Sequence, residues 1–392
     1  MPQGHPVYAS MQTTIFEHMS GLSRELGAIN LGQGFPDGHG PLALREAAAR
    51  ALIERSSQYP PSLGLPELRS AVAAFYGRQQ GLDLTPANVV VTSGATEAVA
   101  VAVMALVQPG DEVILFAPAY DAYAPMVRRC GGVPVFVPLL PPGWRYDAAA
   151  LRAAITPKTR VLMLNDPLNP AGTVASAADL AMLAETCVAH DLTAICDEVW
   201  EMVRFDGQPH RSLLAFPGMA ERTVKIGSAG KIFGLTGWKI GWLIAAPPLA
   251  ALLARAHQFV TFTTPPALQW AVVEGLALPD AWFADLVGEW ATSRARLAAG
   301  LARAGLPVLA NAATWFLCVD LAAAGIALPD RAFSERLIRE AGVASIPVSA
   351  LYEGSDAPAT VVRFCFTKPD AMLDDACQRI ATFRDRLIQS ES

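Results

Sequence analysis

The chain has 392 residues, of which 52% are hydrophobic and 17% charged, and its formal net charge is −6. A chain of this size and composition can bury a large core, which excludes intrinsic disorder and suggests more than one domain. Its acidic balance argues against a nucleic-acid partner, and its longest apolar run, 98–107, is too short to cross a membrane. We therefore expect a cytoplasmic, globular protein with neither kind of partner.

Lysine is scarce in this sequence. Of the 30 basic residues only five are lysines, namely Lys158, Lys225, Lys231, Lys239 and Lys368, so a reaction that needs a lysine has few candidates. The six histidines are scattered, and the six cysteines form no Cys-x-x-Cys pair. These spacings predict that the protein has no metal site.

Short apolar runs alternate with helical patterns from residue 88 onward. Such alternation is typical of an α/β protein in which helices flank a mainly parallel sheet. The predicted strands are 88–92, 112–116, 133–138, 160–164, 193–197, 223–226 and 240–245, and the predicted helices are 96–107, 120–130, 151–155 and 177–190. Ligands of such sheets bind beyond the carboxyl ends of the strands, so functional residues should directly follow strands.

The two ends of the chain differ from this pattern. Residues 1–45 are rich in glycine and proline and are predicted to be irregular, whereas a long amphipathic helix at 282–304 precedes the strands predicted at 314–320 and 360–367. We therefore predict a large α/β domain at 46–284. A smaller α+β domain would combine the N-terminal segment, 1–45, with residues 285–392.

Three segments of the large domain combine small, polar and acidic residues directly after strands. The segment 93–98 opens a helix, where small residues allow backbone N–H groups to hold an anion, although an ordinary N-cap also explains it. The prolines of the loop 165–172 would stiffen it and present the amides of two asparagines to the crevice. Alternatively, the loop is simply rich in turns. Asp197 ends an apolar strand, where a buried carboxylate needs a cationic partner. Alternatively, Asp197 is the N-cap of the following segment.

A glycine-rich loop between two strands contains two of the five lysines, Lys231 and Lys239. An isolated lysine usually lies on the surface. The apolar surroundings of this pair favour burial instead, which lowers the pKa of a lysine and suits it to Schiff-base chemistry.

Together these segments resemble the fold-type I pyridoxal-phosphate aminotransferases of class I/II. The resemblance is strongest to the branch that contains kynurenine aminotransferase/glutamine transaminase K, methionine aminotransferases and some N-succinyldiaminopimelate aminotransferases. It covers roughly residues 8–385. The motifs that carry it are NLGQGFPD at 30–37, QYP at 58–60, GATEA at 94–98, PAYDAY at 118–123, NDPLNPAG at 165–172, DEV at 197–199, SAGK at 228–231, GWK at 237–239 and RF at 363–364.

The resemblance implies a role for each site residue. Lys231 would bind pyridoxal 5'-phosphate covalently and carry a proton between the substrate's α-carbon and the cofactor's C4′. Asp197 would pair with the ring nitrogen, and Arg363, helped by the Gly34 N–H, would clamp the substrate's α-carboxylate. Asn169 and Trp200 would contact the phenolic oxygen, Asn169 would also contact the substrate, and Tyr120 would stack on the ring face. The phosphate would be bound by Ala95, Thr96, Ser228, Lys239 and a neighbouring subunit's Tyr59. A homodimer with active sites at its interface follows from this resemblance.

The sequence departs from the family's pattern at three places. Trp200 stands where the family usually has tyrosine, and because indole can donate a hydrogen bond but neither accept one nor ionise, we expect an altered pKa at the cofactor linkage. Gly230 replaces a frequent serine or threonine, and the usual Gly-x-Tyr-Phe of the small domain reads ATWF at 313–316. The last two departures bear on substrate fit more than on the type of reaction.

The expected activity is amino-group exchange between an amino acid and a 2-oxo acid. Phe16, together with Tyr8, Ile15, Tyr123 and Trp200, could form an apolar, aromatic pocket, which favours methionine, aromatic or glutamine-like substrates; these side chains could equally just pack the N-terminal segment. The alternatives are a carbon–sulfur β-lyase, an N-succinyldiaminopimelate aminotransferase and a non-catalytic regulatory module of the same fold. The last is disfavoured by the presence of Lys231, Asp197 and Arg363 and by the lack of a basic DNA-binding extension.

Overall fold

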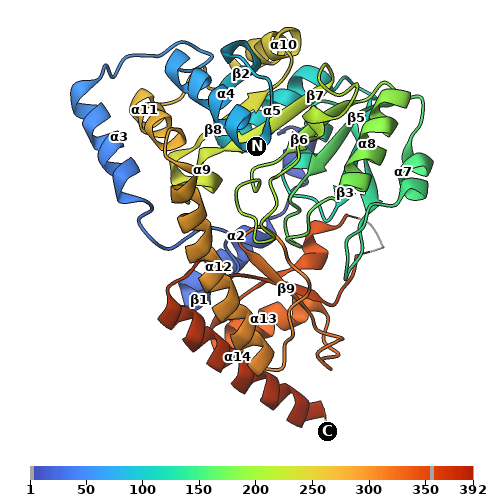
Figure 1. Ribbon diagram of the computed structural model, residues 1–392. Helices are drawn as coiled ribbons and strands as arrows, with labels where there is room; N and C mark the ends of the chain where they lie inside the picture. Colours follow the sequence, from blue (N-terminus) through green and yellow to red (C-terminus); the bar gives the residue numbers. More distant parts are fainter. Residues whose placement is uncertain (1–3, 354–356, 392) are drawn as a thin grey trace.

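A seven-stranded sheet forms the centre of the larger part of the molecule (Figure 1). The computed structural model describes residues 4–353 and 357–391. The order of the strands is β2-β8-β7-β6-β5-β3-β4, and only β8 runs antiparallel to its neighbours, so the predicted mainly parallel α/β sheet is confirmed. The strands are β2 (Val89–Ser93), β3 (Glu112–Ala117), β4 (Val133–Pro138), β5 (Thr159–Asn165), β6 (Thr193–Asp197), β7 (Thr223–Ser228) and β8 (Ile240–Ile244).

Helices cover both faces of this sheet because side chains alternate between the two faces of each strand. On β6, Ile195 packs in the same core cluster as α5, whereas Ala194 and Cys196 pack with α8 on the opposite face. The helices of this part are α3 (Leu42–Glu54), α4 (Pro66–Gln80), α5 (Gly94–Leu106), α6 (Tyr123–Arg129), α7 (Ala148–Ala154), α8 (Ala177–Ala189), α9 (Ala229–Ile232), α10 (Pro247–His257) and α11 (Pro266–Leu276).

The smaller part lies below the large sheet in Figure 1 and is built around a three-stranded antiparallel sheet of order β11-β12-β9. The 24-residue helix α12 (Asp280–Arg303), about 36 Å long at 1.5 Å per residue, runs down from the large sheet and packs against α14. The remaining elements of this part are β9 (Phe316–Asp320), α13 (Asp330–Ala341), β10 (Val343–Ala344), β11 (Ile346–Pro347), β12 (Val361–Cys365) and α14 (Asp370–Glu391).

The N-terminal segment is more regular than its glycine and proline content indicates. It contains α1 (Pro6–Ala9), the twelve-residue α2 (Ile15–Leu26) and β1 (Ile29–Asn30), which pairs with β10. Thr14 caps α2 through the Glu17 N–H, and Gly27 ends it in a left-handed conformation. Met19 and Leu22 of α2 pack with Ile338 and Ile346 of the small part. The prediction that residues 1–45 are irregular is therefore wrong for α2, whose apolar residues follow a helical spacing.

Element boundaries also differ from the predictions at places that matter for the site. The helix predicted at 120–130 begins only at Tyr123, which leaves Tyr120 and Asp121 in a turn after β3. The strand predicted at 314–320 begins at Phe316. The predicted domain boundaries at 45/46 and 284/285 fall inside α3 and α12, and the two-domain division stays a prediction. Within the described ranges, no helix has the length and apolar character needed to span a bilayer.

Candidate active site

Six strands of the same sense, β2 to β7, have their carboxyl ends at one edge of the large sheet. A cavity of about 750 Å³ opens beside this edge. That volume is ordinary for a small-molecule site. Nearly all of the predicted site residues line it, namely Phe16, Gly34, Ala95, Thr96, Tyr120, Asn169, Asp197, Trp200, Ser228, Lys231, Lys239 and Arg363. Tyr59 does not: its side chain is 83% exposed and packs edge-on against Phe262.

The first turn of α5 forms an anion cradle at one end of the cavity. Helix N-termini carry free N–H groups and a positive dipole end. Gly241 needs glycine because a Cβ there would lie 2.8 Å from the Ala95 nitrogen, and Gly94 needs it because its φ is +73°. Lys239 Nζ lies beside Gly94, 3.2 Å from where a Cβ would be. Ser228, at the end of β7, lines the same cavity. The cradle therefore combines backbone N–H groups, a hydroxyl and an ammonium.

Asp197 places a carboxylate in the middle of the cavity, at the end of β6. The side chain is buried, Tyr123 donates a 2.5 Å hydrogen bond to Oδ2, and the Val199 N–H donates to Oδ1. Burial raises the pKa of Asp197, while the Tyr123 hydrogen bond and the charge of Lys231 oppose that rise. A carboxylate in this position is stabilised further by any cation that enters the cavity.

The loop after β5 is fixed to β6 by the side chain of Asn165. Its Nδ2 donates to the Asp197 carbonyl oxygen at 3.0 Å, and its Oδ1 accepts from the Asn169 N–H at 2.9 Å. Asn169 Oδ1 in turn accepts a 2.8 Å hydrogen bond from Arg363 Nη1. Since the oxygen of the Asn169 amide faces Arg363, its NH₂ group is the end that can donate to a ligand.

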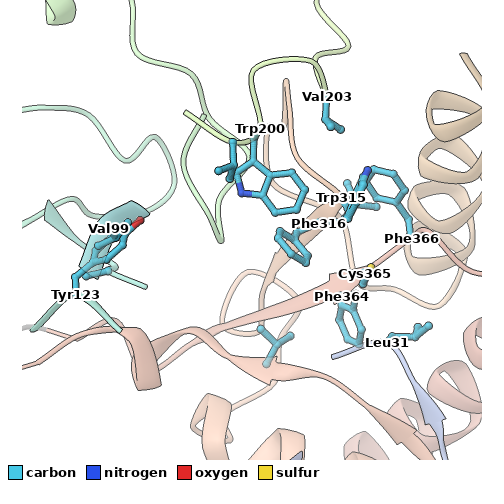
Figure 2. Close-up of a cluster of buried hydrophobic side chains, with 14 of the residues drawn as sticks. Leu31, Val99, Tyr123, Trp200, Val203, Trp315, Phe316, Phe364, Cys365 and Phe366 are labelled. Atoms are coloured by element: carbon cyan, nitrogen blue, oxygen red, sulfur yellow. The ribbon is translucent and has the colours of Figure 1, made fainter. Parts of the chain in front are cut away.

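The amine of Lys231 lies beside two indole rings that are in contact with each other. Its Nζ is 4.6 Å from the ring centroid of Trp200 and 5.1 Å from that of Trp315, and it donates a long hydrogen bond to the Gly34 carbonyl oxygen. Figure 2 shows Trp200, Trp315 and Phe316 gathered in one cluster, with the rings of Trp200 and Trp315 in edge contact. Burial lowers the pKa of Lys231 to about 8, whereas the aromatic faces favour its ammonium form.

Arg363 comes from the small part of the molecule and is buried, with 1% of its surface exposed. Its guanidinium stacks 3.9 Å from the ring centroid of Phe316, faces Phe16, and donates to the Gly32 carbonyl oxygen at 2.6 Å. Its Nε has no hydrogen-bond partner, and within the described residues no carboxylate forms an ion pair with it. A buried guanidinium without a counter-ion is a site prepared for a carboxylate ligand.

Several residues of the site were not assigned their roles from the sequence. Tyr123 was expected only in the substrate pocket, yet it holds Asp197; Asn165 and the Gly32 carbonyl fix the orientation of other groups. Trp315 lies within the motif that departs from the family, which is the one signal that could have found it. Ile15 was expected in the pocket but packs with Met19 and Ile338 instead, because it lies on the inner face of α2.

The donors and acceptors of the cavity fit pyridoxal 5'-phosphate. The anion cradle suits a phosphate, the buried Asp197 suits a protonated ring nitrogen, the Asn169 NH₂ group suits a phenolate oxygen, and the Lys231 amine suits an aldehyde. The fit does not depend on a metal ion.

Comparison with known proteins identifies the family. The family model "Aminotransferase class I and II" matches residues 27–380. The chain is 44% identical over 385 residues to a probable N-succinyldiaminopimelate aminotransferase of Mycobacterium tuberculosis, covering 95% of this chain and 97% of that protein. It is 38% identical over 372 residues to the methionine aminotransferase of Escherichia coli, covering 94% and 95% of the two chains.

Solved structures give the same result. The structure of N-succinyldiaminopimelate aminotransferase from Mycobacterium tuberculosis superposes with a TM-score of 0.93 at 44% identity, covering 97% of this chain and all of that one. An Escherichia coli protein with a methionine aminotransferase function superposes equally well, at 37% identity, over 97% of this chain and 99% of its own. The chain therefore belongs to the class I and II aminotransferases, and it is a pyridoxal 5'-phosphate-dependent transaminase.

Proposed function

We propose that this enzyme transfers the amino group of a neutral amino acid, of the methionine, aromatic or glutamine-like kind, to a 2-oxo acid. The observation that carries this proposal is the distribution of charge in the cavity. Its lining residues include three cations, Lys231, Lys239 and Arg363, and each already has a task in binding the cofactor or the α-carboxylate. No further arginine or lysine lines the cavity among the described residues, so a second substrate carboxylate would lack a partner.

The rest of the wall supports a neutral side chain. The cavity surface near the N-terminal segment is formed by apolar and aromatic residues, namely Tyr8, Met11, Phe16, Phe35, Met126 and Phe316. Asp121 is the acidic group on this side, and burial raises its pKa. An acidic substrate side chain would meet this carboxyl group rather than a cation.

The residues of the site divide the chemistry between them. Arg363 and the Asn169 amide hold the α-carboxylate, and this orients the α-carbon toward Lys231. When bound, pyridoxal 5'-phosphate supplies an electron sink for the pair left on the α-carbon. Asp197, held by Tyr123, keeps a negative charge at the end of β6. Lys231 Nζ accepts the proton that leaves the α-carbon and keeps it inside the cavity, from which the same amine can return it.

N-succinyldiaminopimelate is the second candidate substrate, because the relative at 44% identity is named as an aminotransferase of this compound. It carries a succinyl carboxylate, which would need a cation that the single chain does not place in the cavity. A β-lyase is a third candidate because it begins with the same loss of the α-proton. A non-catalytic regulator is opposed by the prepared arrangement of Lys231, Asp197 and Arg363.

We also propose that the enzyme is a cytoplasmic homodimer whose Tyr59 reaches the phosphate of the neighbouring subunit. Large apolar side chains are exposed in two segments, 52–59 and 259–262, which meet where Tyr59 packs against Phe262. Ile53 and Phe259 are each 85% exposed. Such apolar exposure is typical of a subunit interface. Tyr59 is outside the cavity of its own chain, which supports a role in the partner's site.

The amine of Lys231 should react with the cofactor with a pH midpoint near 8. Only the neutral amine attacks the aldehyde, so the rate of covalent attachment of pyridoxal 5'-phosphate to the apoenzyme should rise with pH. Because an indole face stabilises the ammonium by about 0.5–2 kcal/mol, the midpoint should fall from wild type to Trp200→Tyr and further to Trp200→Leu, by about one pH unit in total. Stopped-flow absorbance measures the rate, and Trp270→Leu, outside the cavity, is the control. Identical midpoints in all four proteins would contradict stabilisation of the Lys231 ammonium by the Trp200 ring.

The substrate class can be tested without an acceptor. Holoenzyme is mixed with single amino acids, and the loss of the cofactor's visible absorbance is followed. Methionine, phenylalanine, kynurenine and glutamine should convert at least tenfold faster than aspartate and N-succinyldiaminopimelate, because the cavity lacks a second cation. Faster conversion of either acidic substrate would reverse the assignment. Release of pyruvate and ammonia from cystathionine would indicate the lyase, and full activity of Lys231→Ala would remove that residue from the mechanism.

Mixed dimers test whether the site is shared. Tyr59→Phe should weaken cofactor binding about tenfold, since it removes one hydrogen bond to a charged phosphate, without changing the dimer mass in light scattering. In heterodimers of Tyr59→Phe and Lys231→Ala chains, half of the sites would combine an intact Lys231 with an intact Tyr59 and regain wild-type affinity. A monomeric mass, or heterodimers in which no site recovers, would refute the shared site.

A further inference from the structure

A second group of ionisable side chains is buried behind the cofactor site, on the opposite face of the large sheet. Lys225 of β7 is opposite Cys196 of β6 and is completely buried, whereas the neighbouring pair, Ile226 and Asp197, faces the active site. Full burial of a lysine is costly unless its charge is paired. Lys225 is one of the five lysines in the chain. The chemistry described above gives it no role.

The ammonium of Lys225 is held between two buried carboxylates that follow Asp197 in the chain. Its Nζ donates to Glu198 Oε2 and, at 2.5 Å, to Glu201 Oε2, and both carboxylates are at most 1% exposed. The face of the Tyr76 ring covers the ammonium at 4.7 Å. Glu198, Glu201 and His210 present three ligand atoms within 4.8 Å of one another, as a metal site would, but here the lysine supplies the cation.

All four oxygens of the two carboxylates have at least one hydrogen-bond partner. Ser212 Oγ donates to Glu198 Oε1 at 2.8 Å and His210 Nε2 is 2.9 Å from Glu198 Oε2, while Gln80 and Tyr76 donate to Glu201. Burial opposes the charge of Glu198, but Lys225 and His210 more than offset it, and the pKa of Glu198 falls to about 2. Glu198 is therefore built to remain a charged partner of Lys225.

The negative charge of Glu198 matters because the residue is bonded directly to Asp197. Two adjacent buried carboxylates repel each other, and the charge of Glu198 acts to raise the pKa of Asp197. Asp197 must nevertheless stay ionised to hold a protonated ring nitrogen. Replacement of buried ion pairs by apolar residues is often neutral or stabilising, so stability alone is weak grounds for this arrangement.

We propose that Lys225 is a fixed counter-charge which offsets one of the two negative charges of Glu198 and Glu201 behind the sheet and so keeps Asp197 ionised for the cofactor. Lys225 is in this sense a positioning residue, which acts on the cofactor through Glu198 and Asp197 without touching it. The inference rests on the proposed role of Asp197. It predicts that net charge in this group, more than its packing, controls the affinity for the cofactor.

The test measures the dissociation constant of pyridoxal 5'-phosphate for the apoenzyme between pH 6 and pH 9, by absorbance titration. Lys225→Met keeps the length of the side chain but removes the charge, and should weaken binding at least tenfold at pH 8. The loss should shrink toward pH 6, where the uncompensated carboxylates can take up a proton. Lys225→Met/Glu201→Gln restores the wild-type net charge and should bind within threefold of wild type at every pH. Lys158→Met, at an exposed lysine, is the matched control.

The comparison is made with wild type at each pH because other groups around the cluster titrate as well. Burial raises the pKa of Asp166 to about 6, and it does so in every variant. The titratable groups that face Lys225 are Tyr76 from α4, Cys196 from β6, and Glu198 and Glu201 from the loop after β6. Behind them, His210 contacts Glu198, and Asp166 lies 3.9 Å from His210.

Asp197→Asn separates failure of this inference from failure of the proposed site. If Asp197→Asn binds the cofactor normally, the role of Asp197 is wrong. The counter-charge is refuted if Asp197→Asn binds the cofactor weakly while Lys225→Met binds it like wild type. It is also refuted if Lys225→Met and the double variant lose the same cofactor affinity at every pH. Should Lys225→Met not fold, Glu201→Gln makes the opposite change in charge and should bind at least as tightly as wild type; weaker binding would overturn the inference.

Discussion

The burial of one carboxylate, Asp197, is the constraint around which the site is arranged. A carboxylate at the end of an apolar strand is costly to ionise unless hydrogen bonds and positive charge compensate for its lost hydration. Tyr123 donates to it from the segment after β3, and Asn165 fixes its backbone from the end of β5. The rest of the cost of ionising Asp197 is offset only when a cation enters the cavity. The buried carboxylate therefore favours the binding of a protonated ring.

The few lysines of the chain show how the environment of a residue sets its chemistry. Lys225, Lys231 and Lys239 lie within fifteen residues of each other, yet their surroundings differ. Lys225 is held between two glutamates, Lys231 lies beside the paired indole rings of Trp200 and Trp315, and Lys239 lies beside the first turn of α5. The first is stabilised as a charge, the second has its pKa lowered to about 8 by burial, and the third adds an ammonium to the anion cradle.

Much of this arrangement could be predicted from the sequence, because strand-end residues in a parallel sheet converge whatever the details of packing. This rule brings Asp197, Asn169 and Lys231 together, whereas Arg363, in β12 of the small antiparallel sheet, is expected in the same cavity only from the resemblance to the family. Contacts between distant segments could not be: nothing local indicates that Tyr76 and Glu201 meet, or that Trp315 faces Lys231. Helix α2 is not evident from composition, because the glycine and proline around it mask its helical spacing of apolar residues. What the sequence does not indicate is therefore which distant side chains meet, whereas the reacting groups themselves can be identified from it.

The central claim is that Lys231, alone among the five lysines, carries the cofactor. Reduction of the holoenzyme with borohydride would fix the linkage, and mass spectrometry of the proteolytic peptides would then locate the added pyridoxyl phosphate. The account predicts one label per chain, on Lys231, with Lys225 unmodified behind the sheet and Lys239 unmodified at the phosphate. A label on Lys239 or Lys225, or no label on a protein that retains its visible absorbance, would contradict it.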